Sequence, residues 1–221
     1  MKKYTIAIFD LDGTVIDSSE GVTKSVTYAL DKHGYAHGDL DSLKCFIGPP
    51  LREQFMTYCN ADEEKGNELV RTYREYYSEK GAFECFVYEG IPYLLKSLKD
   101  AGFKVLLATS KAEKFAKVIL DHFNLSEFFD CVCGSYMDNS RTAKDEIIEY
   151  ALTSTGLEKS KESAVMIGDS KFDVLGARKA GIDAVAVSYG FGSMEELIES
   201  KPIKICKNAG ELRDYLLYRR Q

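Results

Sequence analysis

Near its start the chain reads Ile6-Ala7-Ile8-Phe9-Asp10-Leu11-Asp12-Gly13-Thr14. The first four residues form a continuous apolar run without alternation, which is typical of a strand buried on both faces. Asp10 and Asp12 then follow at the carboxyl end of this strand, where ligands bind in open α/β sheets. Two carboxylates this close repel each other unless a cation or a shared proton compensates, and Mg²⁺ suits such oxygen ligands. An acidic turn is the alternative, since Asp and Gly are ordinary turn residues.

The composition narrows the class of protein. The 221 residues are 45% apolar, which supports a packed core, and the formal net charge is −6. With a pI near 5.3, the chain is a poor candidate for binding nucleic acid or an anionic membrane. Lys2 and Lys3 precede too short an apolar run for a signal peptide, and no run approaches the length of a membrane span. The six cysteines include no C-x-x-C spacing, so we expect reduced thiols and a cytoplasmic location.

Helical periodicity dominates residues 17–85. Apolar residues at helical spacing predict helices over 22–30 and from Leu51, after Pro49-Pro50, with a loop over 35–48 between them. A third helix should end at Gly81. Its tyrosines are spaced for packing within this segment: Tyr73, Tyr76 and Tyr77. The segment therefore predicts a nearly all-helical insert.

Strands and helices alternate in the rest of the chain. Apolar runs predict strands at 103–108, 129–133, 164–167 and 182–187, a weak strand at 203–206, and helices between them. This alternation is typical of a parallel sheet with helices on both faces. We therefore expect an α/β fold with a Rossmann-like core over 1–16 and 86–221, and a helical cap domain over 17–85 inserted after the first strand.

Polar residues follow several of these strands. Thr109 and Ser110 end the second strand, Asp169 and Asp173 follow the fourth, and Lys144 lies near the start of the helix after the third. In a parallel sheet these ends meet at one edge, together with Asp10 and Asp12. Carboxylates suit a hard divalent ion, whereas a hydroxyl, an ammonium and backbone N–H groups suit a phosphoryl group.

The order of these motifs resembles the haloacid dehalogenase superfamily of phosphatases. The matching elements are Asp10-x-Asp12-Gly13-Thr14, a strand ending in Thr109, Lys144, and Gly168-Asp169-x-x-x-Asp173. The resemblance covers the whole chain, and the insert looks like that superfamily's small helical cap. Ile47-Gly48-Pro49-Pro50-Leu51 and Thr109-Ser110-Lys111 look most like the phosphoglycolate phosphatase-like branch, which also contains 5′-nucleotidases and pyrophosphatases.

The resemblance implies roles for the acidic residues. Asp10 would be the nucleophile that forms an aspartyl-phosphate, and Asp12 would be the general acid and then the general base. Mg²⁺ would bind Asp10, the backbone carbonyl of Asp12, and Asp169. Asp173 would order the groups around the metal or hold Lys144.

The resemblance also implies a phosphate-binding set. Thr109 and Lys144 would clamp the phosphoryl oxygens, and Ser110 and Gly13 would supply backbone N–H donors. This chain departs from the common pattern at two positions: Asp145 follows Lys144 in place of Pro, and Ser110 replaces Asn. Neither change should abolish the chemistry, but both weaken the transfer of any particular substrate.

Three further cations lie near these motifs. For Arg52 in the insert and Arg141 before Lys144, contact with the substrate and a solvated surface position are equally favoured. For Lys171 a surface helix position is favoured.

The function expected from this resemblance is Mg²⁺-dependent hydrolysis of a small phosphorylated metabolite, most readily a phosphoglycolate-like compound or a 5′-nucleotide. The enzyme would be a monomer or homodimer, and the cap would select the substrate. The alternatives are a phosphotransferase such as a sugar phosphomutase, an inorganic pyrophosphatase, a signalling module that carries phosphoaspartate, and an idle binding protein.

Overall fold

The chain forms two compact units. The computed structural model describes residues 4–138 and 141–218. Met1–Ile16 and Val87–Gln221 form the first unit, called here the core, and Asp17–Phe86 form the second, called the insert. The division expected from the sequence put the second boundary between residues 85 and 86. Each unit is described below by itself.

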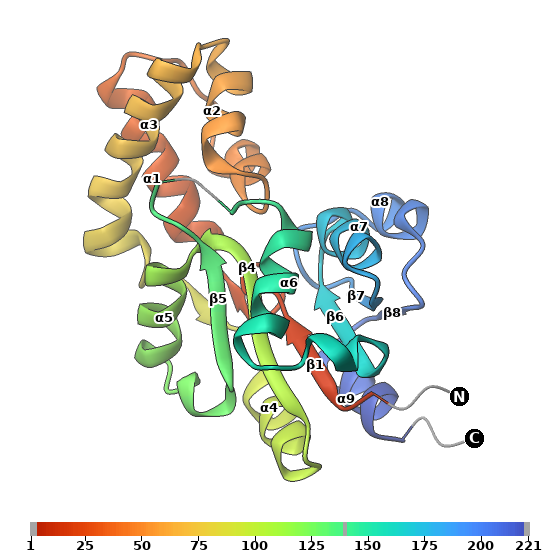
Figure 1. Ribbon diagram of the computed structural model, residues 1–221. Coiled ribbons are helices and arrows are strands. Elements are labelled where there is room, and N and C mark those ends of the chain that lie inside the picture. Colours follow the sequence, from red (N-terminus) through yellow and green to blue (C-terminus); the bar gives the residue numbers. More distant parts are fainter. Residues whose placement is uncertain (1–3, 139–140, 219–221) are drawn as a thin grey trace. The chain divides into compact units, whose positions relative to one another are not determined.

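Strand β1 (Ile6–Phe9) lies inside the core sheet, between β4 (Lys104–Ala112) and β6 (Ala164–Gly168), and it runs parallel to both. Within the described residues the sheet has six strands in the order β5-β4-β1-β6-β7-β8 (Figure 1). Phe9 pairs with Leu107 on one side and Ile167 on the other. The residues that follow β1, β4 and β6 therefore meet at one edge, and the predicted α/β fold is confirmed.

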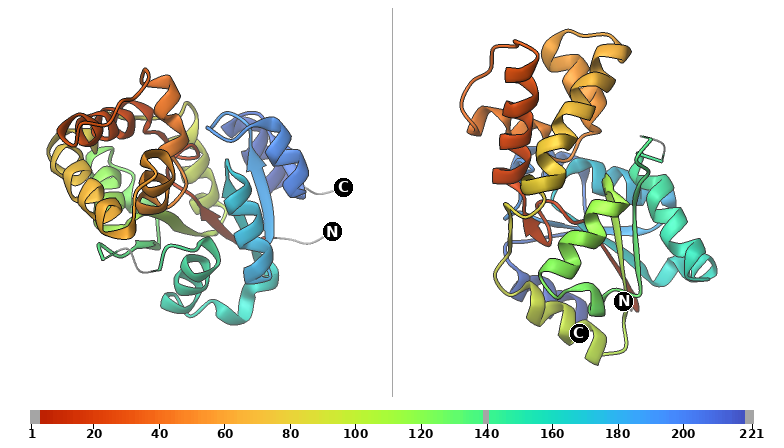
Figure 2. Two further views of the ribbon diagram at one scale, coloured as in Figure 1. Left: turned by 90° about the horizontal axis from the view of Figure 1, so that it is seen from above. Right: turned by 90° about the vertical axis from the view of Figure 1, so that its left-hand side faces the viewer.

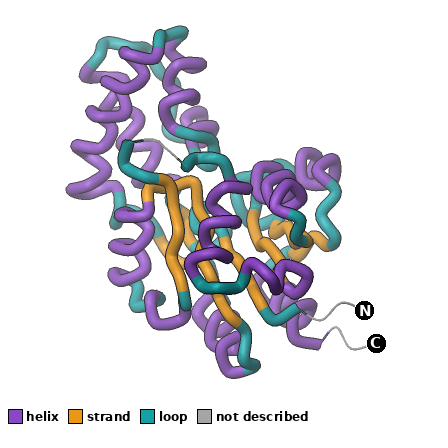
Figure 3. The backbone as a smooth tube through the Cα atoms, viewed as in Figure 1, coloured by secondary structure: helices purple, strands orange, loops and turns teal. Residues whose placement is uncertain are grey.

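Helices cover both faces of this sheet (Figure 3). On one face, α6 (Lys144–Ser154) packs against β4 and β5, and α7 (Lys171–Ala180) packs against β6 and β7. Ile6 and Ile8 point into the apolar cluster beneath these helices. On the other face, α4 (Ile91–Asp100) and α5 (Glu113–His122) pack on β4. Because successive strand residues alternate between faces, Ala7 and Phe9 point toward that second layer.

The remaining core elements complete the chain. Strands β5, β7 and β8 are Cys131–Ser135, Asp183–Val187 and Lys204–Cys206, helices α8 and α9 are Met194–Ser200 and Ala209–Tyr218, and two 3₁₀ turns are Ser126–Phe128 and Glu158–Ser163. The six cysteines, all among the described residues, are thiols outside any disulfide. Within the described residues, every helix is too short or too polar to cross a membrane.

Two predicted strand boundaries were wrong. β4 continues to Ala112 instead of ending at 108, because it resumes its pairing with β5 beyond an irregularity between Thr109 and Ala112. β5 begins at Cys131 instead of 129. The reason is Asp130, whose N–H donates to the carbonyl of Val105 and whose carboxylate accepts the N–H of Val105, so the chain turns into the sheet at that residue.

The insert is a bundle of helices. Its helices are α1 (Ser19–Lys32), α2 (Leu51–Cys59) and α3 (Glu63–Tyr76), with a 3₁₀ turn at Asp41–Phe46 and a π-helical turn at Tyr77–Gly81. Helix α3 packs against both α1 and α2 (Figure 2). The 3₁₀ turn lies in the segment expected to be a loop, where buried Phe46 contacts the ring of Phe55 at 4.8 Å between centroids.

Aromatic packing holds the end of α3. The rings of Tyr73 and Tyr77 stack at 5.2 Å, and both side chains are buried. Tyr76 contacts the ring of Tyr28 at 5.7 Å. The expectation that these tyrosines pack within the insert is confirmed.

The core and the insert are joined at two short strands. β2 (Ile16–Asp17) leads into the insert, β3 (Phe86–Val87) leads out of it, and the two form their own two-stranded sheet. The chain reaches β2 through a tight loop in which the N–H groups of Val15 and Ile16 both donate to the carbonyl of Leu11.

Candidate active site

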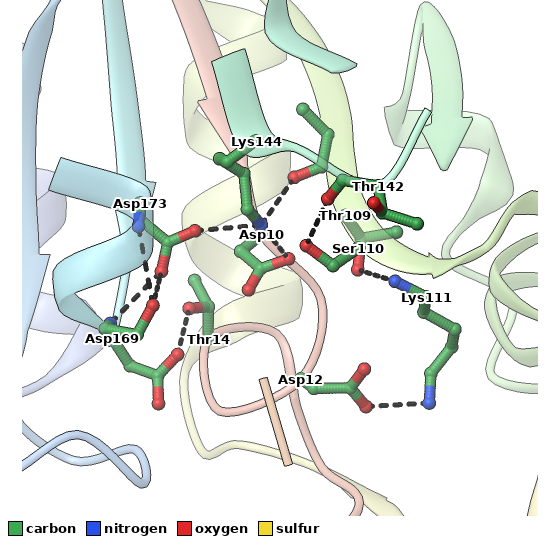
Figure 4. A network of polar contacts seen from close by, with 12 residues as sticks. Asp10, Asp12, Thr14, Thr109, Ser110, Lys111, Thr142, Lys144, Asp169 and Asp173 are labelled. Atoms are coloured by element: carbon green, nitrogen blue, oxygen red, sulfur yellow. Dashed lines mark hydrogen bonds and ion pairs between the residues drawn. The ribbon is translucent and has the colours of Figure 1, made fainter. Parts of the chain in front are cut away.

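The carboxyl end of β1 carries a buried carboxylate. The N–H of Asp10 still donates to the carbonyl of Ile167 at 2.8 Å, so its backbone is fixed by the sheet. Its side chain lies beside those of Asp169 and Asp173, which come from the end of β6 and the first turn of α7 (Figure 4). One carboxylate oxygen from each lies within 4.8 Å of the others. All three residues are buried, so the acids share a site with little access to water.

Lys144 supplies a positive charge to this cluster. It is the first residue of α6, and its Nζ lies 2.8 Å from Asp10 Oδ1 and 2.9 Å from Asp173 Oδ1. The same Nζ donates to the carbonyl of Ala108 at 3.1 Å. Burial opposes the charged form, but Asp10 and Asp173 together raise the pKa of Lys144 above its ordinary value. The ammonium is therefore held by two carboxylates and the backbone carbonyl of Ala108.

The cluster holds more negative than positive charge. Burial, opposed by Lys144, raises the pKa of Asp10 to about 6, with Asp173 adding to the rise. Burial and then the charges of Asp173 and Asp10 raise the pKa of Asp169 to about 8. Both raised pKa values mean that the nearby positive charge does not fully balance the ionised carboxylates. Apart from their ion pairs with Lys144, Asp10 Oδ1 and Asp173 Oδ1 are buried without a hydrogen bond among the described residues. A hard cation with oxygen ligands fits this set of donors.

A loop after β7 orients Asp169. Its Oδ2 accepts the N–H of Phe191 at 2.7 Å and the N–H of Gly192 at 3.4 Å, and its Oδ1 accepts the hydroxyl of Thr14 at 3.4 Å. The hydroxyl of Tyr189 donates to the carbonyl of Thr14 at 2.9 Å. The sequence indicated only a loop here. A signal that could have indicated its role is the Gly-x-Gly of Gly190-Phe191-Gly192, which follows a strand at the same edge of the sheet.

Gly13 and Gly190 let the backbone approach Asp169. A Cβ on Gly13, whose φ is +78°, would lie 2.1 Å from Asp169 Oδ2. A Cβ on Gly190 would lie 2.3 Å from the carbonyl of Gly13. The N–H of Gly13 donates to the carbonyl of Ile16 at 2.8 Å, so this donor is already used within its own turn. What Gly13 contributes in this structure is space beside Asp169.

Asp173 also caps its own helix. The hydroxyl of Ser170 donates to Asp173 Oδ2 at 2.6 Å, and the N–H of Ser170 donates to the same oxygen at 3.1 Å. In return Ser170 Oγ accepts the N–H of Asp173 at 3.4 Å, which completes a capping box at the start of α7. One carboxylate oxygen is thus used by the cap, and the other faces Lys144.

The end of β4 brings three further residues to the edge. Thr109 is buried, and its Oγ1 accepts the N–H of Lys111 at 3.2 Å. The hydroxyl of Ser110 donates to the carbonyl of Thr142 at 3.5 Å. Lys111 Nζ lies 2.9 Å from Asp12 Oδ1 (Figure 4). No role for Lys111 was predicted from the sequence. The signals available were its place in the Thr109-Ser110-Lys111 motif and its position two residues after Thr109 at a strand end.

The guanidinium of Arg141 binds residues other than the clustered carboxylates. The guanidinium of Arg141 donates to the carbonyl of Gly134, pairs with Glu113 at 3.1 Å, and stacks between the rings of Tyr136 and Tyr150. These contacts favour a structural anchor over a solvated position.

Arg52 and Lys171 also have acidic neighbours. Within the insert, Arg52 pairs with Glu53 and Glu63 at 2.9 and 2.8 Å. Contact between the substrate and Arg52 or Arg141 stays a prediction. Lys171 pairs with Glu196 and its side chain is partly exposed, which fits a surface helix residue.

Known proteins share this arrangement of sequence and fold. The family described as haloacid dehalogenase-like hydrolase matches residues 7–187. A 5′-nucleotidase of Pseudomonas aeruginosa is 42% identical over 214 residues, which cover 97% of this chain and 96% of that protein. The tyrosine-protein kinase PtkA of Mycobacterium tuberculosis is 35% identical over 96% of this chain and 72% of its own length.

A solved structure is also similar over nearly the full length. The crystal structure of a predicted phosphatase from Clostridium acetobutylicum superposes with a TM-score of 0.94 at 45% identity, covering 98% of this chain and 99% of that one. The order of the acidic motifs, the six-stranded parallel sheet and these similarities lead to one conclusion. The chain belongs to the haloacid dehalogenase-like hydrolase family and is an enzyme of the phosphatase type.

Proposed function

We propose that this protein hydrolyses the phosphate monoester of a small metabolite through an aspartyl-phosphate on Asp10, with Mg²⁺ as cofactor. The observation that carries the proposal is the buried cluster of Asp10, Asp169 and Asp173 beside Lys144. A 5′-nucleotide is the first substrate class to test, because the 5′-nucleotidase relative is 42% identical over nearly the whole chain. Phosphoglycolate-like compounds, suggested by the motifs of the sequence, are the second.

The charges of the site support the cofactor. The carboxylates of Asp10, Asp12, Asp169 and Asp173 face two ammonium groups, those of Lys144 and Lys111. With all four carboxylates ionised, two negative charges remain, which one divalent cation would balance. Asp10, Asp169 and the carbonyl of Asp12 would hold Mg²⁺, and the bound ion would offset the repulsion between an attacking carboxylate and a phosphate dianion.

Asp10 would act as the nucleophile. An oxygen of its carboxylate would attack phosphorus, a new O–P bond would form, and the ester O–P bond would break. Lys144 keeps this carboxylate in place, and it favours the ionised form that the attack needs. Thr109 and Lys144 would contact the phosphoryl oxygens as they gain charge.

Asp12 would move the protons. In the first half of the reaction its carboxyl proton would pass to the leaving ester oxygen. In the second half its carboxylate would take a proton from a water molecule as that water attacks phosphorus. This attack would break the bond to Asp10, release inorganic phosphate and return both aspartates to their starting state.

A phosphate-release screen tests the proposal. The panel contains 5′-nucleotides, phosphoglycolate, sugar phosphates and pyrophosphate, each with and without Mg²⁺. Asp10→Asn and Asp10→Ala should both lose turnover. The matched control is Asp145→Asn, which lies next to Lys144 in the chain and pairs with Lys179 at the surface. Substantial hydrolysis by both Asp10 variants would exclude the mechanism.

A phosphotransferase is the second candidate, because a relative named tyrosine-protein kinase PtkA is 35% identical over 96% of this chain. Such an enzyme would pass the phosphoryl group from Asp10 to a second hydroxyl instead of water. Adding acceptor alcohols or tyrosine peptides to the same assay separates the two. Hydrolysis predicts free phosphate whatever the acceptor, whereas transfer predicts a phosphorylated acceptor. The cytoplasmic location, the monomer or homodimer, and substrate selection by the insert stay predictions.

A further inference from the structure

A bulge at the end of β4 sets the position of Lys111. Thr109 pairs with Gly134 of β5 and Ala112 pairs with the next residue, Ser135. β4 therefore advances three residues while β5 advances one, and Ser110 and Lys111 are extra in the ladder. Bulges beside active sites commonly redirect a side chain. Here the redirected side chain is that of Lys111, which runs toward the loop after β1 (Figure 4).

Gly134 makes room for this bulge. A Cβ at this position would lie 2.4 Å from the carbonyl oxygen of Lys111 and 2.7 Å from the backbone nitrogen of Glu113. The carbonyl of Gly134 is fixed in turn by Arg141, whose Nε and NH2 donate to it at 3.0 and 2.7 Å. The base of the Lys111 side chain is therefore held by backbone packing and by a bound guanidinium.

The end of the same side chain holds Asp12. Its ammonium lies 2.9 Å from Asp12 Oδ1, with the side chains 8% and 12% exposed. Among the residues the structure describes, Asp12 Oδ1 has no hydrogen bond of ordinary geometry, so this ion pair is the contact that fixes the atom. A charge in a nearly closed site is costly without a partner, so the two side chains keep each other in place.

We propose that Lys111 is a positioning residue that holds the carboxyl group of Asp12 in line with the leaving ester oxygen. The inference rests on the proposed function, because it assigns Lys111 to the proton transfer proposed for Asp12. A positioning role differs from direct contact with the phosphoryl group, which would make Lys111 a second phosphate-binding residue beside Lys144. The low exposure of Lys111 and its pairing with Asp12 favour positioning.

The two roles differ in their dependence on the leaving group. An alkyl phosphate needs the proton of Asp12, whereas p-nitrophenyl phosphate leaves as a stable anion and needs it little. We expect Lys111→Met to lower kcat/KM for the best alkyl phosphate of the panel by about 100-fold, and for p-nitrophenyl phosphate by less than about 10-fold, since general acid catalysis is worth roughly 10²–10⁴. Lys111→Arg keeps the charge, so it should recover part of the activity on the alkyl phosphate. It should leave the activity on p-nitrophenyl phosphate as in Lys111→Met.

The matched control is Lys104→Met, at the other end of β4. Lys104 is exposed and also pairs with an aspartate, Asp130 at 3.2 Å, so its loss should leave both substrates unaffected. Gly134→Ala tests the bulge itself, because it keeps the ammonium but displaces its base. It should reproduce the selective loss on the alkyl phosphate.

Equal losses on the two substrates in Lys111→Met would overturn the inference and indicate contact with the phosphoryl group or a general structural defect. Unchanged kinetics would overturn it as well. These outcomes are distinct from a failure of the proposed function, which is judged from wild type and the Asp10 variants alone. A crystal structure of Lys111→Met gives a readout without turnover: the Asp12 side chain should leave its wild-type position.

Discussion

The ammonium of Lys144 lies 2.8 Å from the carboxylate of Asp10, and both side chains are buried at the carboxyl end of β1. This pair links the start of α6 to the central part of the sheet. It also has two effects that can be separated by experiment. The ammonium stabilises a folded state that contains buried acids, and it keeps the nucleophile proposed for the reaction ionised.

Replacing Lys144 by Met should therefore reduce both stability and activity. Removing one partner of a buried ion pair costs about 3–5 kcal/mol, because the other charge is left without compensation. We expect that loss in the free energy of unfolding, measured with urea at pH 8, and no phosphate release. The deficit should shrink at pH 5, where protonation removes the stranded charge of Asp10. A variant as stable as wild type at pH 8 would contradict the importance of the pair.

Stability of the metal-free protein should fall as the pH rises. The pKa values of Asp10 and Asp169 in the folded protein are about 6 and about 8, above the value of about 4 for an unfolded aspartate. The folded state thus binds more protons than the unfolded state between pH 4 and pH 8. The stabilisation from these two groups is complete below pH 4 and is lost as the pH rises through 6 and 8. Thermal melts in EDTA across this range measure the loss.

Adding Mg²⁺ should reverse this trend, because the ion binds the ionised carboxylates. At 100 times the dissociation constant, binding contributes about 2.7 kcal/mol, or about 5–10 °C in Tm for a chain of this length. We expect such a shift at pH 8 and a smaller one at pH 5, where protons compete for the same oxygens. Equal shifts at both pH values would indicate binding outside this cluster. EDTA should also stop phosphate release.

Gly190→Ala should weaken metal binding without a direct change to any acid. The new Cβ would lie 2.3 Å from the carbonyl of Gly13 and 2.4 Å from Cβ of Asp169, so the loop or Asp169 must move. Loss of such supporting contacts typically costs about 10- to 100-fold in metal affinity or activity. Titration of the Mg²⁺ dependence of phosphate release measures the effect. The control is Gly210→Ala in α9, where the new Cβ meets only the side chain of Asn208 at 3.1 Å.

Asp130→Ala should destabilise the fold and leave catalysis intact. The carboxylate of Asp130 accepts the N–H of Val105 at 2.9 Å and pairs with Lys99 at 2.6 Å, before β5 and away from the carboxyl ends of the strands. Leaving a partly buried donor unsatisfied costs about 1–3 kcal/mol. We expect a loss of that size in urea unfolding, with kcat and KM within about twofold of wild type at 25 °C, since roughly two-state unfolding leaves the folded fraction active. A large fall in kcat would show that this end of β4 influences the site.

The sequence was sufficient to predict the parallel sheet and which residues share its edge. The uninterrupted run Ile6–Phe9 indicated a strand buried on both faces, and the alternation after residue 86 indicated its neighbours. Once strands are parallel, their carboxyl ends coincide, so Asp10, Thr109 and Asp169 had to meet. These inferences need only the period of the apolar residues and the direction of the strands.

The supporting contacts depend on features that have no local pattern. The bulge at Ser110 and Lys111 arises from the register between β4 and β5, and it requires Gly134, which lies 23 residues further along the chain. The engagement of Arg141 depends on where the rings of Tyr136 and Tyr150 fall in space. Propensity and spacing describe neighbours in sequence, whereas these contacts are set by packing between distant segments.

The small sheet of β2 and β3 brings the two ends of the insert together. The chain leaves the core at Ile16 and returns at Val87, and the two strands that make these connections pair with each other. Whatever segment is threaded between them starts and finishes at one point. The entropy of closing a longer loop grows only by about 0.6 kcal/mol per doubling of its length. The length of this segment can therefore change at little entropic cost, while the carboxylates of the core stay where the sheet places them.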